Sequence, residues 1–394
     1  MNKANKEYLV KKYHERFGED ASHYLDCGGR FEILGNHTDH NHGLCIVGTC
    51  DLCVGAAVSK RPDDIVYIVS EGHNDICIDV KSLTLEKGEY GSSSGIVKGV
   101  IDYIRNAGYK FGGFNAYMSS DIATGIGVSS SAAFELLIGQ IVNVLFNKGS
   151  IDKLVLAKAG QHAENKYFGK KSGLLDQIGV AYGEVNVVDF GNIDKPNVIH
   201  VDFPFKDLHF ILIDTGGSHS ELSDYYSSIP ESMFEVAKHF GAKVLREVKQ
   251  SEFDAEVLEE KEHGHQHFDP VDEHRATHFF LENKRVIDAF KAIKNNDEET
   301  FLRMINESQH SSQNNLFNTQ VENQYAGSPQ EAVDYANAHI ENGAVKINGG
   351  GFAGSIICFV RDNEVKSFVE KMKKRFGEDK VIELHLRKDG PCVR

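Results

Sequence analysis

The chain has 394 residues, of which 41% are hydrophobic and 26% are charged, and its formal net charge is −15. This length predicts two domains, because one hydrophobic core rarely serves so long a chain. The acidic balance, with no basic block, excludes nucleic acid and anionic membranes as main partners. No run of about 20 apolar residues and no signal-peptide core occur, so we expect no membrane partner and a cytoplasmic protein.

Hydrophobic periodicity predicts helices and strands in the first half of the chain and mostly helices in the second half. The residues divide near Gly191, Pro196 and Pro204 into a domain over 1–200 and a domain over 201–394. The predicted helices cover 1–18, 94–107, 132–145, 151–168, 230–248, 276–294, 298–314, 328–341 and 363–375. The predicted strands cover 44–58, 65–70, 76–80, 114–118, 185–190 and 210–214, and 345–360 is expected to begin as a strand followed by a glycine loop.

The segment GIGVSSSAA from Gly125 lies between a predicted strand and a predicted helix. Glycines let a backbone approach an anion closely, and serine is favoured where a helix begins. A strand, a glycine loop and a buried helix N-terminus together predict a phosphate site. No GxxxxGK[ST] motif occurs, and no complete GxGxxG motif occurs in a βαβ context, which disfavours P-loop and Rossmann folds.

Two further regions carry polar groups that suit chemistry. The segment GGRFEILGNHTDHN from Gly28 is dense in donors and acceptors, as a polyhydroxylated ligand requires, although a polar turn would have the same composition. Glu164 and Asp176 are carboxylates near this predicted nucleotide site. One could hold Mg²⁺ and the other could accept a hydroxyl proton, but spacing alone does not bring them together.

Two patterns favour a structural interpretation. Cys50 and Cys53 form a CxxC within a predicted strand, where residues three apart face opposite sides, and no second CxxC completes a zinc set. The segment 251–275 is rich in glutamate and histidine and could hold a metal, but a solvated surface helix or loop is the preferred interpretation.

The glycine-rich segments occur in an order that resembles the galactokinase branch of the GHMP small-molecule kinases. The first is similar to the sugar-binding signature GRxNLIGEHTDYN, the second to the phosphate loop GLSSSA, and NGGGFAG from Asn348 to a C-terminal GGGFGG motif. GLLDQ resembles GIMDQ, and the resemblance extends over about residues 25–360. It implies an α+β fold of two GHMP kinase-like domains, with the active site in the interdomain cleft.

The resemblance also implies an ATP-dependent sugar-1-kinase, most closely a galactokinase, with ATP and Mg²⁺ as cofactors and a sugar as partner. Asp176 would be the catalytic carboxylate, Arg30 would keep it ionised, and Ser131 and Glu164 would bind the metal. The implied sugar contacts are Asn36, His37, Asp39, His40, Gly173 and Tyr226. The implied ATP contacts are Gly125, Gly127, Val128, Ser129, Ser130, Ser131 and Ala132, and the closing third loop is Gly349, Gly350, Gly351 and Phe352.

The signature departs from the family pattern at two positions that bear on the sugar. Asn36 stands where the family has Glu, and His40 stands where it has Tyr. Replacing an anionic acceptor by an amide weakens a hydrogen bond to a C6 hydroxyl and removes repulsion against a C6 carboxylate. A galacturonokinase or another C6-altered sugar kinase is therefore one alternative, and a catalytically silent sugar and ATP sensor is another. We expect a monomer or a weak homo-oligomer.

Overall fold

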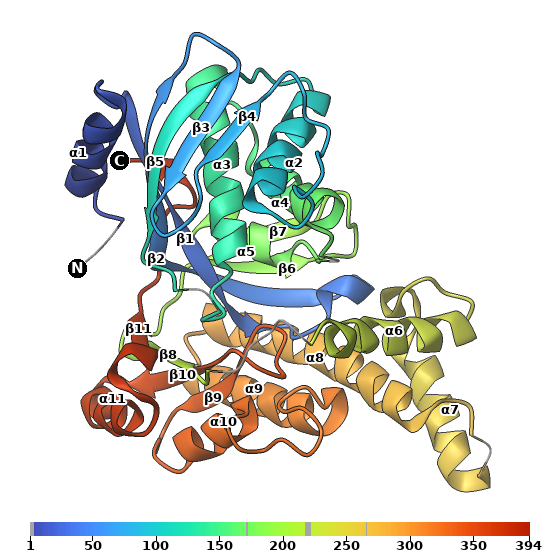
Figure 1. The fold of residues 1–394 in the computed structure, drawn as a ribbon. Coiled ribbons are helices and arrows are strands. Elements are labelled where there is room, and N and C mark those ends of the chain that lie inside the picture. The colour runs from blue at the N-terminus through green and yellow to red at the C-terminus, as the bar shows by residue number, and fades with distance from the viewer. Residues whose placement is uncertain (1–3, 124, 171, 217–221, 265) are drawn as a thin grey trace.

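The computed structural model describes residues 4–123, 125–170, 172–216, 222–264 and 266–394, and it contains two β-sheets with helices around them (Figure 1). The helices are α1 (Lys6–Phe17), α2 (Ser93–Asn106), α3 (Ser130–Asn147), α4 (Lys153–His162), α5 (Leu175–Tyr182), α6 (Ser223–His239), α7 (Gln250–His263), α8 (Pro270–Lys294), α9 (Glu298–Ser311), α10 (Pro329–Asn337) and α11 (Asp362–Phe376). The short helices are η1 (Asp39–Asn41), η2 (Ala163–Phe168), η3 (Leu245–Glu247), η4 (Ser312–Leu316) and η5 (Glu378–Lys380).

The first sheet is built mainly from the N-terminal half of the chain. Its strand order is β12-β1-β2-β5-β3-β4, and β6 pairs with β2 and with β7; only the β3–β5 pair is parallel among the described pairings. The strands are β1 (His23–Leu34), β2 (Leu44–Lys60), β3 (Ile65–Ser70), β4 (Ile76–Asp79), β5 (Phe114–Ser120), β6 (Val185–Asp189), β7 (Asn197–Val201) and β12 (Cys392–Val393). Helix α1 packs on one face of this sheet, while α3 and α5 pack on the other with α2 and α4 behind them (Figure 1).

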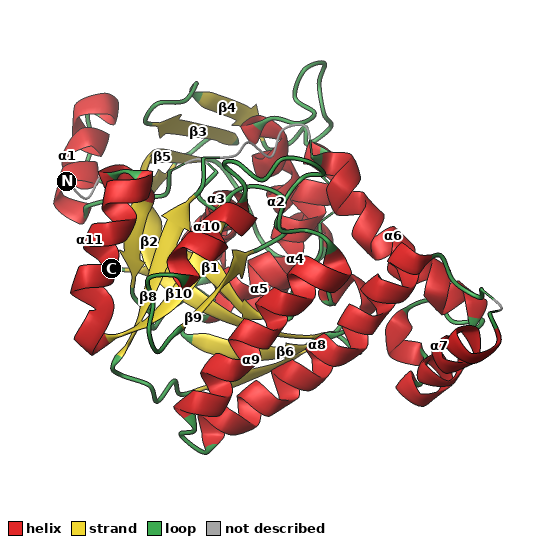
Figure 2. Cartoon of the chain, turned by 90° about the horizontal axis from the view of Figure 1, so that it is seen from below, coloured by secondary structure: helices red, strands yellow, loops and turns green. Residues whose placement is uncertain are grey.

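The second sheet has four strands and belongs to the C-terminal half. Its order is β11-β8-β10-β9, all antiparallel, from β8 (Leu208–Asp214), β9 (Ala344–Asn348), β10 (Ser355–Arg361) and β11 (Val381–Leu384). Helices α10 and α11 cover one face through an apolar cluster that includes Ile211, Val333 and Phe368. The other face of this sheet packs against Phe301 of α9 and against the large apolar core of the first sheet. The two sheets therefore share one continuous apolar interior (Figure 2).

Strand β1 is bent by two register irregularities, between Gly28 and Arg30 and between Glu32 and Leu34. Such bulges re-aim side chains and end regular pairing. At Gly29 any Cβ would lie 3.1 Å from Val128 Cγ2 and closer still to the Val128 carbonyl, so only glycine lets the loop before α3 rest on the strand. The next residue, Arg30, donates its backbone N–H to the Val128 carbonyl at 3.0 Å. The bulge therefore fixes Arg30 beside the loop of residues 125–129 that precedes α3, which we call the serine loop.

The serine loop ends in a left-handed residue at the start of α3. Ser129 has φ 56° and ψ 61°, and its side chain makes no capping bond to the helix. The hydroxyl can therefore bond to a group outside the helix. The first-turn N–H groups of α3, which form the positive end of the helix dipole, face the loop. Among the described helices, α3 is the one that is long and apolar enough to cross a membrane, by length and composition alone. In this structure it packs against β1 and β2 in the core.

Most predicted elements are present, and several differ from the periodicity. The helix expected over 230–248 is α6, which begins earlier, ends at His239 and is followed by η3. The glycine segment after Asn348 is a strand–loop–strand element, β9 and β10. Part of the segment 251–275 is helix α7, whereas residues 265, 171 and 1–3 of the predicted features lie outside the described residues. The predicted division at residue 200 stays a prediction, and the last strand, β12, returns to pair with β1.

Candidate active site

Arg30 joins the first sheet, the serine loop and α5 at one point. Its Nε donates to Asp176 Oδ1 at 2.7 Å, and its Nη1 donates to the Gly127 carbonyl at 2.6 Å. The other carboxylate oxygen of Asp176 accepts a short hydrogen bond from the Ser129 hydroxyl. Arg30 is buried, whereas the Asp176 side chain is 30% exposed. Arg30, Ser129 and Asp176 thus form one polar cluster, in which the Asp176 side chain is partly exposed to solvent.

The charge state of this cluster follows from its neighbours. Burial alone would raise the pKa of Asp176, but the Arg30 cation, with further help from Lys170 and the Ser129 hydroxyl, lowers it to about 2. The folded-state pKa is below the ordinary value, so this carboxylate is ionised and its pairing stabilises the fold at all pH values above about 4. A fixed anion is therefore partly exposed at this point of the molecule at neutral pH.

A second cluster lies at the first turn of α3 and contains the two predicted metal ligands. Ser131 Oγ donates to Glu164 Oε1 at 2.9 Å, and Lys170 Nζ lies 3.0 Å from the same oxygen. Gln177 Nε2 donates to Glu164 Oε2 at 3.1 Å and to Glu135 Oε2 at 3.0 Å. Glu164 lies in the π-helical turn η2, a feature often associated with functional sites. Hydroxyl and carboxylate oxygens are the donors that Mg²⁺ prefers, and a magnesium site often uses only one or two carboxylates.

The loop of residues 35–43 between β1 and β2, which we call the signature loop, meets the segment before α5. A Cβ on Gly173 would overlap Asp39 Oδ2 and come within 3.6 Å of His40 Cε1, so the Asp39 carboxylate lies directly against the glycine backbone. Asp39 and His40 begin η1, and the His40 ring nitrogen Nε2 is 3.7 Å from Asp39 Oδ1. The structure therefore brings together three of the predicted sugar contacts.

Asn36 has a different environment from the one the sequence suggested. Its side chain is fully buried: Nδ2 donates to Glu32 Oε1 at 3.1 Å and to the Gly349 carbonyl at 2.7 Å, and Oδ1 accepts from Asn318 Nδ2 at 2.9 Å. Glu32 in turn accepts from Lys346 Nζ at 2.8 Å. The Asn36 side-chain amide thus makes its hydrogen bonds to protein groups. Its contact with a sugar C6 group stays a prediction.

The third glycine loop closes against the signature loop and α6. His37 Nε2 lies 2.9 Å from the Gly350 carbonyl, and Tyr226 donates its hydroxyl to the Gly351 carbonyl at 2.7 Å. Burial lowers the pKa of His37 to about 3, so its imidazole is neutral and Nε2 carries a proton for that carbonyl. Phe352 packs edge-on against the Tyr226 ring at 5.5 Å. The predicted third-loop residues therefore lie beside His37 and Tyr226.

Asn348 links this third loop to the serine loop. Its Nδ2 donates to the Gly127 carbonyl at 3.0 Å and its Oδ1 accepts the Glu32 backbone N–H at 3.0 Å. A Cβ on Gly127 would overlap Ser355 Oγ at the start of β10. Both predicted halves of the chain thus contact Gly127, whose carbonyl also accepts from Arg30, so the Arg30 cluster lies where the halves meet.

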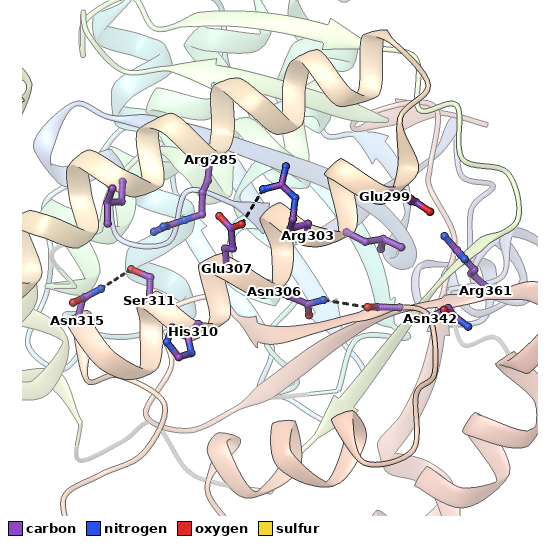
Figure 3. Close-up of a pocket in the computed structure, with 13 residues that line it drawn as sticks. Arg285, Glu299, Arg303, Asn306, Glu307, His310, Ser311, Asn315, Asn342 and Arg361 are labelled. Atoms are coloured by element: carbon purple, nitrogen blue, oxygen red, sulfur yellow. Dashed lines mark hydrogen bonds and ion pairs between the residues drawn. The ribbon is translucent and has the colours of Figure 1, made fainter.

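A groove of about 640 Å³ lies elsewhere, along α8 and α9 (Figure 3). Its lining includes Arg285, Arg303 and His310, and it contains none of the predicted site residues. Arg285 donates to Glu282 at 2.7 Å, and Glu282 accepts the Gly35 backbone N–H at 2.9 Å. The groove therefore borders the layer of side chains behind the signature loop.

Several residues of these clusters were not singled out from the sequence. Glu32, Lys346 and Asn318 hold Asn36, and Gln177, Glu135 and Lys170 surround Glu164. Burial, with repulsion from Glu164, raises the pKa of Glu135 well above its ordinary value. For two of these residues the sequence showed only that they lie near a motif: Glu32 lies inside the sugar-binding signature, and Gln177 follows Asp176. Asn318 and Lys346 reach the site through the fold alone.

Comparisons with known proteins agree with this geometry. Residues 11–60 match the galactokinase galactose-binding signature, residues 95–184 match the GHMP kinases N terminal domain, and residues 289–378 match the GHMP kinases C terminal family. The chain is 30% identical to a galactokinase of Glaesserella parasuis serovar 5 and 29% identical to a galactokinase of Lactobacillus helveticus, covering 97% and 95% of both chains, respectively.

A solved structure shows the same fold. The crystal structure of Lactococcus lactis galactokinase complexed with galactose superimposes with a TM-score of 0.83 at 26% identity, over 98% of this chain and 99% of that chain. The two-sheet fold and the serine loop at α3 define the class of protein as the GHMP kinases. Within this class, the chain belongs to the galactokinase family.

Proposed function

We propose that this protein is a galactokinase, which transfers the γ-phosphoryl group of ATP to the anomeric hydroxyl of galactose and releases galactose 1-phosphate and ADP. The observation that supports this reaction best is the convergence of Arg30, Asp176 and Ser129 at the start of α3. It places a fixed carboxylate beside a helix N-terminus suited to phosphate, in a chain that matches the galactose-binding signature.

In this mechanism Asp176 orients the attacking hydroxyl. Its pKa of about 2 makes it a weak base, so the carboxylate first accepts a hydrogen bond from the hydroxyl, and the proton moves as the new P–O bond forms. Arg30, held by the Gly127 carbonyl, keeps Asp176 ionised and supplies positive charge where the phosphoryl group passes. Positioning and charge stabilisation provide most of the acceleration.

The nucleotide would be held by the serine loop. Gly125 to Ala132 supply backbone N–H groups at the N-terminus of α3, and Ser131 and Glu164 supply the oxygen donors for Mg²⁺. When bound, Mg²⁺ neutralises the phosphate oxygens of ATP. Lys170 provides a cation beside Glu164.

The sugar would lie between Asp176, Asp39 and the third loop. Asp39, held against Gly173, offers carboxylate oxygens that accept hydrogen bonds from hydroxyl groups, and His37 and Tyr226 hold the loop that covers the sugar. The His40 side chain, which is 30% exposed, lies beside Asp39 and would contact the sugar from the same side. We further propose that the protein acts in the cytoplasm, which is supported by its seven free cysteines, and that it is a monomer or weak homo-oligomer.

The test is ATP consumption by the purified protein with Mg²⁺ and a panel of sugars: galactose, galacturonate, N-acetylgalactosamine, glucose, arabinose and fucose. We expect turnover with galactose to exceed that with every other sugar. Turnover with galacturonate alone would instead support a C6-altered sugar kinase. ATP binding without turnover of any sugar would contradict the proposal and support a catalytically silent sensor.

A further inference from the structure

Two histidines and two glutamates meet at the far end of α6, outside the site described above. His239 is the last residue of α6, Glu256 and Glu259 lie on α7, and His267 lies in the segment before α8. These helices form the arm at the lower right of Figure 1 and the right of Figure 2. Beneath them is a separate apolar cluster that includes Phe253 and Phe268.

The ligand atoms of this cluster are close together. One donor atom each from His239, Glu256 and His267 lies within 4.8 Å of the other two. His239 Nε2 is 2.6 Å from Glu256 Oε2, and His267 Nε2 is 2.7 Å from Glu259 Oε2. Glu256 and Glu259 are three residues apart on α7 and therefore share a face of the helix. His239, Glu256 and His267 are therefore close enough to share one ion, and Glu259, which is hydrogen-bonded to His267, is the fourth donor beside them.

The surrounding structure holds the two histidines in place. Glu260 accepts hydrogen bonds from the backbone N–H groups of His267 and Phe268, the second at 2.7 Å. The Phe268 ring packs edge-on against the His239 ring at 4.9 Å. Because the two imidazoles come from different elements and share one aromatic neighbour, their nearness is a property of the packed arm rather than of a histidine-rich sequence.

We propose that His239, Glu256, Glu259 and His267 form a binding site for a divalent first-row transition metal ion, with zinc(II) as the preferred ion. Imidazole nitrogens and carboxylate oxygens are ligands that zinc takes in tetrahedral sites. Each ligand now paired with its neighbour would turn to the ion, with both imidazoles neutral and both carboxylates ionised. Bound zinc would tie the end of α6 to α7 and to the start of α8.

This site is independent of the proposed kinase reaction. His239 lies thirteen residues along α6 from Tyr226, or about 20 Å at 1.5 Å per residue. The metal would therefore stabilise the arm without touching sugar or nucleotide. A second cluster, Glu184, His200 and Asp202, has a single imidazole and two exposed members, and it serves as a comparison.

The experiment is calorimetric titration of the chelator-treated full chain with zinc chloride, followed by the visible spectrum with cobalt(II) and by thermal unfolding with and without zinc. We expect one site with a Kd of about 1 µM or tighter and a raised melting temperature. His239→Ala, His267→Ala and Glu256→Gln should each weaken binding at least about tenfold. His200→Ala and the exposed His263→Ala are the matched controls and should bind as the parent does.

Three results would overturn the site. The first is zinc binding weaker than about 100 µM by the parent protein. The second is equal loss in His263→Ala, which would assign binding to the histidine-rich surface as a whole. The third is unchanged binding in His239→Ala and His267→Ala together with loss in His200→Ala. Glu256→Gln removes a charge with little change in shape, so it keeps the test decisive where a histidine variant fails to fold. Failure here would leave the kinase proposal intact.

Discussion

Individual side chains of the site are held in defined protonation states by their hydrogen bonds. His278 of α8 is fully buried, with Nδ1 2.9 Å from Ser311 Oγ and Nε2 2.9 Å from the Asn36 carbonyl. A carbonyl can only accept, so Nε2 carries the proton and Nδ1 accepts from the serine hydroxyl. A neutral imidazole thus supports the backbone of the signature loop, whereas Asp176 is held in its ionised form.

This neutral histidine predicts a pH dependence of stability. Burial lowers the pKa of His278 to about 4, below its ordinary value of 6.5, so the unfolded chain takes up the proton first as pH falls. Its contribution is complete above pH 6.5 and is lost between about pH 6.5 and 4, which amounts to about 2 kcal/mol of unfolding free energy by pH 5. We expect His278→Gln, which does not titrate, to lose correspondingly less stability than the parent over this interval.

The measurement is denaturant unfolding at pH 7.5 and pH 5 for both proteins. His310→Gln, an exposed position on the neighbouring helix α9, is the matched control and should behave as the parent does. Equal losses of unfolding free energy in the parent and in His278→Gln would show that this histidine is not the titrating group.

At the scale of elements, the site depends on turns that approach each other more closely than side chains allow. Gly29 lets the serine loop rest on β1, Gly127 lets it meet β10, and Gly173 lets the segment before α5 meet η1. These contacts join segments that are far apart in sequence. Each of them fixes the distance between two polar groups of the proposed site.

Gly173→Ala tests one such contact. The added Cβ would overlap Asp39 Oδ2, so the carboxylate has to move away from its place against the backbone. We expect the KM for galactose to rise at least about tenfold, a loss of roughly 1.4 kcal/mol of sugar binding, while the KM for ATP changes little. Steady-state kinetics with each substrate varied in turn measures both constants.

The neighbouring Ser172→Ala variant is the control for this change. Among the described residues, the Ser172 hydroxyl contacts only Asn165 Oδ1, at 3.5 Å, so its loss should leave both KM values near those of the parent. A Gly173→Ala protein with an unchanged KM for galactose would place Asp39 outside the sugar site.

The elements also show where sequence reasoning succeeds and where it ends. The strong periodicity of α2 and α11 and the motif around α3 predicted those helices, because each pattern is local. Strand β1 was not predicted: its residues His23–Leu34 mix glycines with charges, and pairing with β2 and β12 makes them a strand. The buried state of Asn36 was equally out of reach, since it depends on Glu32, Gly349 and Asn318 arriving from three separate segments.

The whole molecule places the proposed site between its two sheets. Asn348, from β9 of the second sheet, contacts both Gly127 and β1, and Lys346 of the same strand pairs with Glu32 of β1. These contacts extend from one sheet to the other beneath the third loop. The order of motifs in the sequence predicted a two-domain kinase, but this connection could only be seen in the fold.

We propose that the two halves of the chain join to make one phosphoryl-transfer site, with Asp176 as the residue that engages the sugar hydroxyl. The most direct measurement is ³¹P nuclear magnetic resonance of the products formed from ATP, Mg²⁺ and galactose by the parent protein and by Asp176→Asn. We predict galactose 1-phosphate and ADP from the parent, and a rate lower by at least about 100-fold from Asp176→Asn, with ATP binding retained. Near-parent formation of galactose 1-phosphate by Asp176→Asn, or phosphate on another hydroxyl, would contradict the account.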